Sequence, residues 1–223
     1  MVSIDSDMND SKTPRPQLPE PTLRRLPWYL AYVRILDKLH VETVSSTQIA
    51  KELNVDASQI AKDLSFLNIK GKTRIGYDVH QLCRELADFL GFKRKHNAVV
   101  IGVGSLGGAL IQDVGLAQYG LNIVAGFDVK PSIVGTTICG IPVYDIAQLP
   151  QRRQEYNVSI AILTVPVEDA QQAADTVIAG GIKAIWNFTP YRIKVASDIV
   201  IANTSIYSHL AIIYNRMEMR REH

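Results

Sequence analysis

A glycine loop between a short apolar run and a helix-like segment limits the fold of this chain more than any other feature. Residues 97–101 have the composition of a buried strand, residues 102–107 spell GVGSLG, and residues 108–111 continue as an apolar helix. The first glycine allows a tight turn, the second lets a ligand approach the backbone, and the third lets the helix pack close to the strand. The glycine pattern alone would be weak evidence, but this order predicts the first unit of a Rossmann-like parallel sheet.

The segments that follow continue the alternation of strands and helices. Strand-like runs at 122–127, 159–165 and 182–188 are separated by helix-like segments, including 169–179. Asp128 lies 21 residues after Gly107, near the position where an acidic residue of this fold bonds the ribose of a dinucleotide. Its carboxylate would repel a 2′-phosphate, so the pattern favours NAD(H) over NADP(H), although Lys130 lies close by. The expected cofactor contacts are Gly102, Val103, Gly104, Ser105, Leu106 and Gly107 in the loop, Asp128, Val129 and Lys130 after the second strand, and Thr164, Val165, Pro166, Asn187, Phe188 and Thr189 after two later strands.

The front of the chain has the pattern of three helices. An apolar stripe predicts a first, core-packing helix that begins near Pro27 and buries Trp28, Ala31, Tyr32, Ile35, Leu36 and Leu39. Ser45 and Gln48 form the capping box of a second helix, and Asp56 is placed to cap a third. The third helix would turn Ile60, Leu64 and Leu67 inward and leave outside Ser58, Gln59, Lys62 and Ser65.

A basic glycine turn follows the third helix. Lys70, Lys72 and Arg74 flank Gly71 ahead of an alternating segment that suits a hairpin wing. Residues 20–95 carry 13 Lys and Arg against 9 Asp and Glu, whereas residues 96–223 carry 9 against 10. A capped helix that presents polar side chains, beside a basic loop, predicts a winged helix-turn-helix that enters the major groove of DNA. The helices alone would equally suit any three-helix packing module.

The two ends of the chain differ in character. Residues 1–21 are rich in Asp and Pro and lack a basic start with an apolar core, so we expect a disordered leader, no signal peptide and a cytoplasmic protein. No run is apolar enough for a membrane span, and the cysteines and histidines show no metal-site or disulfide spacing. Near the C-terminus a stripe predicts a helix that needs a surface to cover, either its own sheet or a partner subunit, with Ile206, Tyr207, Leu210, Ile213, Tyr214 and Met217.

Taken together, these motifs resemble the Rex family of repressors in order and spacing over about residues 22–215. The matching segments are RLP at 25–27, VSS at 44–46, KDLS at 62–65, GYDV at 76–79, IGVGSLG at 101–107, FD at 127–128, GIPV at 140–143, AILTVP at 161–166 and NFTP at 187–190. The resemblance implies an α/β chain with a winged helix domain at 22–92, an NAD(H)-binding Rossmann domain at 93–204 and a dimerisation helix at 205–223. It also implies a homodimer that exchanges its last helix, binds a palindromic operator in double-stranded DNA and is released by NADH. The DNA contacts would fall on Ser46, Ser58, Gln59, Lys62, Lys72 and Arg74.

The chain departs from the family pattern at several positions. Ala61 stands where the family usually has an arginine, and residues 67–70 replace its short aromatic turn. Ala31 and Ser205 stand where it tends to have an arginine in the first helix and an acidic residue at the start of the last. The first two changes bear on the operator preference. The last two suggest a different latch, meaning a different contact that distinguishes the NAD⁺-bound from the NADH-bound state.

Two other functions fit part of the sequence. One is an NAD-dependent dehydrogenase with an accessory N-terminal domain, although no residue of the back half is placed as its acid or base. The other is a repressor that binds a different nucleotide, such as a coenzyme A derivative, against which Asp128 argues. We expect no catalytic residue and no metal, and therefore a regulator and not an enzyme.

Overall fold

The computed structural model describes residues 18–220 and divides the chain into two units, before and after the Gly91–Phe92 bond. The leader expected at residues 1–21 lies mostly outside the described residues. Between residues 18 and 220 no helix has both the length and the apolar composition needed to cross a membrane.

The first unit is a helical domain with a two-stranded ribbon. Its elements are α1 (Glu20–Lys38), β1 (Thr43–Val44), α2 (Ser46–Leu53), α3 (Ala57–Leu64), β2 (Tyr77–Asp78) and α4 (Val79–Phe89). The predicted caps of α2 and α3 are confirmed, because Gln48 N–H donates to Ser45 Oγ at 3.1 Å and Ser58 N–H donates to Asp56 Oδ1 at 2.7 Å. The strands β1 and β2 are antiparallel, with Val44 opposite Tyr77.

The first helix differs from its prediction in start and in buried face. It begins at Glu20, with Pro21 in its first turn, and it continues through Pro27. Its buried side is formed by Leu26, Tyr29, Leu30 and Val33, so the predicted core stripe was wrong: Trp28, Ile35 and Leu39 are more than half exposed. Both apolar stripes of α1 have helical spacing, so periodicity alone cannot show which of them is buried. Packing against α4 decides it.

The expected wing is a short loop and not a hairpin of two strands. A single antiparallel bridge joins Lys72 to Gly76, and the alternating segment after it continues into β2, which pairs with β1. Gly76 has a φ of +99°, and a Cβ there would lie 2.4 Å from the Val44 carbonyl oxygen. The close approach of β1 therefore requires a glycine at position 76, where the loop continues into β2.

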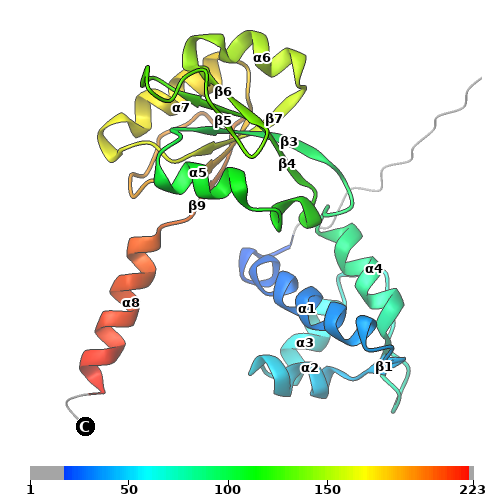
Figure 1. Ribbon diagram of the computed structural model, residues 1–223. Coiled ribbons are helices and arrows are strands. Elements are labelled where there is room, and N and C mark those ends of the chain that lie inside the picture. The colour runs from blue at the N-terminus through cyan, green and yellow to red at the C-terminus, as the bar shows by residue number, and fades with distance from the viewer. Residues whose placement is uncertain (1–17, 221–223) are drawn as a thin grey trace, which may run out of the picture. The chain divides into compact units, whose positions relative to one another are not determined.

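The second unit is a seven-stranded sheet with helices on both faces (Figure 1). Its strands are β3 (His96–Ile101), β4 (Leu121–Asp128), β5 (Thr137–Ile138), β6 (Ile141–Asp145), β7 (Val158–Leu163), β8 (Ala184–Asn187) and β9 (Val200–Asn203). They lie in the order β5-β6-β4-β3-β7-β8-β9, and only the edge strand β5 is antiparallel to its neighbour. Without β5 this is the Rossmann strand order. Successive strands are added on one side of β3 and then on its other side, so the order reverses there. The predicted parallel sheet is confirmed.

Alternate residues of the central strands divide the core of this unit in two. Val99, Ile101 and Phe127 pack on the side of α6 (Leu149–Glu155) and α7 (Ala170–Ala179). Ala98 and Val100 pack on the opposite side with Ile111 of α5 (Ser105–Gln112). The short helices η1 (Leu116–Tyr119), η2 (Ile146–Gln148) and η3 (Val167–Asp169) complete the connections.

The last helix, α8 (Ile206–Met219), has no buried residue. Its apolar side chains Ile206, Tyr207, Ile213, Tyr214 and Met217 are each about half exposed or more. Ser205 caps the helix by accepting a hydrogen bond from Ser208 N–H at 3.1 Å. The sequence led us to expect that this helix covers either its own sheet or a partner subunit. It does not pack on its own sheet.

Candidate ligand cavity and recognition helix

A cavity of about 580 Å³ opens at the carboxyl ends of the parallel strands in the second unit. Ligands of open α/β sheets bind at this edge, beside the strand where the order reverses. Eight of the predicted cofactor contacts line it: Gly102, Gly104, Asp128, Val129, Lys130, Thr164, Val165 and Pro166. The strands thus bring together residues that lie more than sixty positions apart in the sequence.

The glycine loop is held in a conformation that other residues would disturb at two of its three glycines. Gly102 has a φ of +87°, and a Cβ at Gly107 would lie 2.2 Å from the Gly102 carbonyl oxygen. A Cβ at Gly104 would meet no atom within 4 Å. The backbone at Gly104 is therefore open to a ligand, next to the first turn of α5, whose N–H groups have no acceptor inside the helix.

The Asp128 carboxylate joins the glycine loop to the end of β4. Its Oδ2 accepts a hydrogen bond from Val103 N–H at 2.7 Å, and its Oδ1 accepts from Val129 N–H at 2.8 Å and Lys130 N–H at 2.9 Å. Each carboxylate oxygen can accept two hydrogen bonds, so Oδ2 keeps one acceptor site. A ribose hydroxyl could use that site, while the remaining bonds hold the loop in place.

One wall of the cavity was not predicted from the sequence. Asp169, Gln172, Ala173 and Thr176 line it at the spacing i, i+3, i+4 and i+7 from the start of α7, together with Ile101, Phe127 and Ile146. The helical period of 3.6 residues places these four α7 residues on one face. The sequence of the helix does not show, however, that this face turns toward the edge of the sheet.

Several predicted contacts lie outside the cavity lining and have partners within the chain. Asn187 is fully buried: its Nδ2 donates to Tyr191 O and Asn203 Oδ1, and its Oδ1 accepts from Thr189 N–H and Oγ1. These four bonds use the whole capacity of the amide. Asn187 and Thr189 thus shape the loop that carries Phe188. The centroid of the Phe188 ring lies 4.7 Å from that of the Trp186 ring. Contact of these three residues with a dinucleotide stays a prediction. Val103, Ser105, Leu106 and Gly107 belong to the glycine loop and the start of α5.

In the first unit, α3 presents an exposed polar face beside a basic loop. Ser58 and Lys62 are exposed on α3, and Gln59 is half-buried. Lys72 and Arg74 are exposed in the loop, and Ser46 is half-buried at the first position of α2. The geometry brings the six predicted DNA contacts into one unit, on the elements where the sequence placed them.

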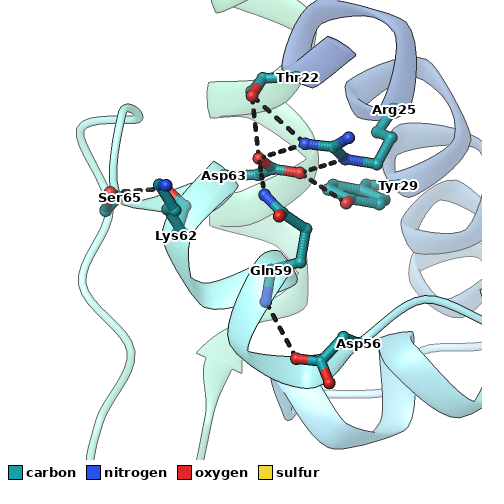
Figure 2. Close-up of polar contacts among 8 residues, drawn as sticks. All are labelled: Thr22, Arg25, Tyr29, Asp56, Gln59, Lys62, Asp63 and Ser65. Carbon is teal, nitrogen blue, oxygen red and sulfur yellow. Dashed lines mark hydrogen bonds and ion pairs between the residues drawn. The ribbon is translucent and has the colours of Figure 1, made fainter. Parts of the chain in front are cut away.

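A buried carboxylate fixes α3 to α1, and no pattern in the sequence pointed to it. Figure 2 shows Asp63 at the centre of this cluster. Arg25 donates through Nε to Asp63 Oδ2 at 2.6 Å and through Nη2 to Oδ1 at 2.9 Å. Tyr29 Oη donates to Oδ2 at 2.8 Å, and Thr22 Oγ1 and Gln59 Nε2 donate to Oδ1 at 3.0 and 2.8 Å.

The charges of this cluster are coupled. Burial alone would raise the pKa of Asp63, but the hydrogen bonds from Arg25, Tyr29, Gln59 and Thr22 outweigh it and lower that pKa below its usual value. Burial and the bond to Asp63 raise the pKa of Tyr29 to about 12. The side chain of Asp63 is completely buried and that of Arg25 is 21% exposed, so the pair is largely removed from water. Asp63 is therefore ionised, and acts only as an acceptor, at neutral pH.

A helix-turn-helix unit followed along the chain by a Rossmann unit with an open cavity defines a class of protein: a DNA-binding regulator that responds to a nucleotide. Family models divide the chain in the same way. The model described as "Putative DNA-binding protein N-terminus" matches residues 17–65, and the model described as "CoA binding domain" matches residues 93–191.

Curated relatives identify the family. The chain is 59% identical over 201 residues to the redox-sensing transcriptional repressor Rex of Bacteroides fragilis, which covers 90% of this chain and 91% of the relative. It is 39% identical to Rex of Treponema denticola over 90% of this chain and 96% of that one. A crystal structure of RSP in complex with NAD⁺ and operator DNA matches with a TM-score of 0.87 and 32% identity over 92% of this chain and 94% of that one. RSP in complex with NADH matches with a TM-score of 0.82 and 32% identity over 92% and 96%. The chain belongs to the Rex family of redox-sensing transcriptional repressors.

Proposed function

We propose that this protein represses transcription as a homodimer on a palindromic operator and leaves the DNA when NADH replaces NAD⁺ in its cavity. The observation that carries this proposal is the match of both units to RSP, a repressor of the same family. RSP has been crystallised with NAD⁺ and operator DNA and with NADH.

The cavity residues support a dinucleotide as the ligand. The open backbone at Gly104 and the first turn of α5 suit a pyrophosphate, and the free acceptor site of Asp128 suits a ribose hydroxyl. The two ligands would share this site, so only a difference in their affinity for two arrangements of the dimer can change DNA binding.

The surface of α8 supports a dimer. Its exposed stripe has no partner within residues 18–220, and an apolar helix face of this kind is typical of a subunit interface. A two-fold dimer places two recognition helices about 34–36 Å apart, one DNA turn, which matches a palindrome.

The protein would act as a regulator in the cytoplasm, where a repressor reaches its operator, and not as an enzyme. Among the described residues that line the cavity there is no histidine or tyrosine. The Asp128 carboxylate is already bonded to three backbone N–H groups. The match of both units to a Rex-family repressor supports the regulator over a dehydrogenase.

Fluorescence anisotropy would test the function. The protein first selects an operator from a random DNA pool, and the labelled operator is then titrated at fixed salt with NADH, NAD⁺ or a coenzyme A derivative. We expect NADH to weaken DNA binding at least about 5-fold more than NAD⁺, a usual size for coupling between two sites. Equal effects of NADH and NAD⁺ would contradict redox sensing, and release by the coenzyme A derivative alone would identify a different ligand.

A further inference from the structure

The half-buried amide of Gln59 is held in one orientation by its neighbour on the recognition helix. Gln59 lies one turn before Asp63, and its Nε2 donates to Asp63 Oδ1 at 2.8 Å (Figure 2). The two amide termini of a glutamine have nearly equal size and are told apart by their partners. An ionised carboxylate can only accept hydrogen bonds, so the group that faces Asp63 must be the nitrogen.

The carboxylate cannot readily turn away from Gln59. Asp63 is completely buried, and Thr22, Arg25 and Tyr29 hold both its oxygens from α1. Its lowered pKa keeps it ionised at neutral pH. Both the position and the acceptor character of the group that orients Gln59 are therefore fixed by the core of the domain.

The carbonyl oxygen of Gln59 has no partner in the described part of the chain. No donor there bonds its Oε1, and this atom is not among the buried polar atoms that lack a partner, so it is not fully buried. The residue sits beside Ser58 on the polar face of α3. An acceptor in a fixed orientation is thus presented where the recognition helix would meet a base edge.

We infer that Asp63 is a positioning residue which makes Gln59 read a base amino group in the major groove. The adenine N6 and cytosine N4 amino groups are the donors exposed there, whereas guanine and thymine present oxygen acceptors. The inference rests on the proposed binding of operator DNA. It adds a direction to the contact, because Gln59 accepts from the base through Oε1 while one of its N–H bonds is committed to Asp63.

Base analogues would test this direction. The operator selected above is remade with purine in place of single adenines and pyrimidin-2-one in place of single cytosines, which removes one amino group at a time. At one position in each half-site we expect wild-type affinity to fall on the order of tenfold, and the fall to be absent in Gln59→Met. Gln118→Met, at an exposed glutamine of the second unit whose side chain makes no hydrogen bond to the described residues, is the matched control and should behave as wild type.

The outcomes separate this inference from the function on which it rests. Failure of the wild-type protein to enrich any DNA would contradict the proposed function itself. Binding in which every amino deletion affects wild type and Gln59→Met alike would overturn only the reading by Gln59. The reading by Gln59 would also be overturned if Gln59→Met changed only the response to 7-deaza purines, which lack a base acceptor, and not the response to the loss of an amino group.

Asp63→Asn gives a second readout that a purely structural role would not change. An asparagine can face Gln59 with either its oxygen or its NH₂, so the glutamine amide is no longer held in one orientation and can present either terminus to the DNA. In protein shown to be folded by circular dichroism, we expect the amino-group requirement to be weakened at the position read by Gln59. A uniform loss of affinity over all analogues, with the requirement retained, would overturn the positioning role of Asp63.

Discussion

Asp63 carries a buried charge in the first unit and receives five hydrogen bonds. Its removal would leave Arg25 with no counter-charge and the other donors with no acceptor. Breaking a buried pair from one side is costly for this reason, even where the intact pair contributes little.

We therefore expect Asp63→Ala to lower the free energy of unfolding by about 3 kcal/mol, as measured by urea denaturation. Asp198→Ala is the matched control, since Asp198 pairs with Lys183 at 2.6 Å while both side chains are more than half exposed. The control should change stability little. Equal effects of the two variants would show that burial of the Asp63 pair does not matter.

The lowered pKa of Asp63 also predicts how stability depends on pH. A group whose pKa is depressed by folding contributes stability above its unfolded pKa and loses it as pH falls through the folded pKa. We expect the wild-type protein to lose stability as pH falls below about 4, and Asp63→Ala to lose less over the same range. Thermal unfolding at a series of pH values would check this, and parallel curves for the two proteins would contradict it.

In the glycine loop, one glycine matters for stability and another for ligand binding. A Cβ at Gly107 would meet the Gly102 carbonyl oxygen at 2.2 Å, whereas one at Gly104 would enter open space. The two glycines stand in one motif but face different neighbours, which are backbone for Gly107 and the cavity for Gly104.

Two alanine variants should therefore behave differently. We expect Gly107→Ala to displace the loop and lower the melting temperature by several degrees, as overpacking of about 1–3 kcal/mol does. Gly104→Ala should keep the melting temperature and bind NADH about tenfold or more weakly, because its methyl group occupies the space of the pyrophosphate. Nucleotide fluorescence and calorimetry would measure both. Unchanged NADH affinity in Gly104→Ala would show that the ligand does not approach this backbone.

Elements defined by local patterns could be predicted from the sequence, and those defined by distant contacts could not. The caps at Ser45 and Asp56 and the order of strand, loop and helix around Gly102 depend on neighbouring residues, and they were correct. The face of α1 was wrong because both of its stripes are apolar, and only packing against α4 distinguishes them. The strands β6 and β9 are only five and four residues long, so no alternation marked them.

The candidate sites show the same limit. The glycine loop, Asp128 and Thr164 were predicted, because the fold brings strand ends to one edge. The α7 wall of the cavity and the Asp63 cluster were not, because they join residues far apart in the sequence. Gln59 was predicted as a DNA contact, but its bond to Asp63 depends on the burial of that carboxylate, which one sequence does not reveal.

The exposed apolar face of α8 suits a partner surface. Ile213 is 50% exposed near the middle of the apolar stripe, and Asn215 is exposed on the same helix outside the stripe. A charge in the stripe would have to be buried in an interface, whereas one at position 215 would remain in water.

We expect Ile213→Glu to shift the protein from dimer to monomer at micromolar concentration, and Asn215→Glu to leave it dimeric. Sedimentation velocity measures the mass of each variant directly. The monomeric variant should also bind a palindromic operator more weakly than wild type, because it no longer presents two linked recognition helices. A dimeric Ile213→Glu protein would exclude this face as the interface.

The hydrogen bond from Val103 N–H to Asp128 has a consequence for the kinetics of the unliganded protein. Since this amide is bonded at 2.7 Å within a buried contact, its hydrogen should exchange slowly with solvent before any nucleotide binds. The loop is then preorganised, and little ordering accompanies the arrival of either redox form. NADH and NAD⁺ would enter the same rigid cradle through the adenosine and pyrophosphate that they share. The protein must then distinguish NADH from NAD⁺ at the nicotinamide end, where the two ligands differ in ring structure and charge.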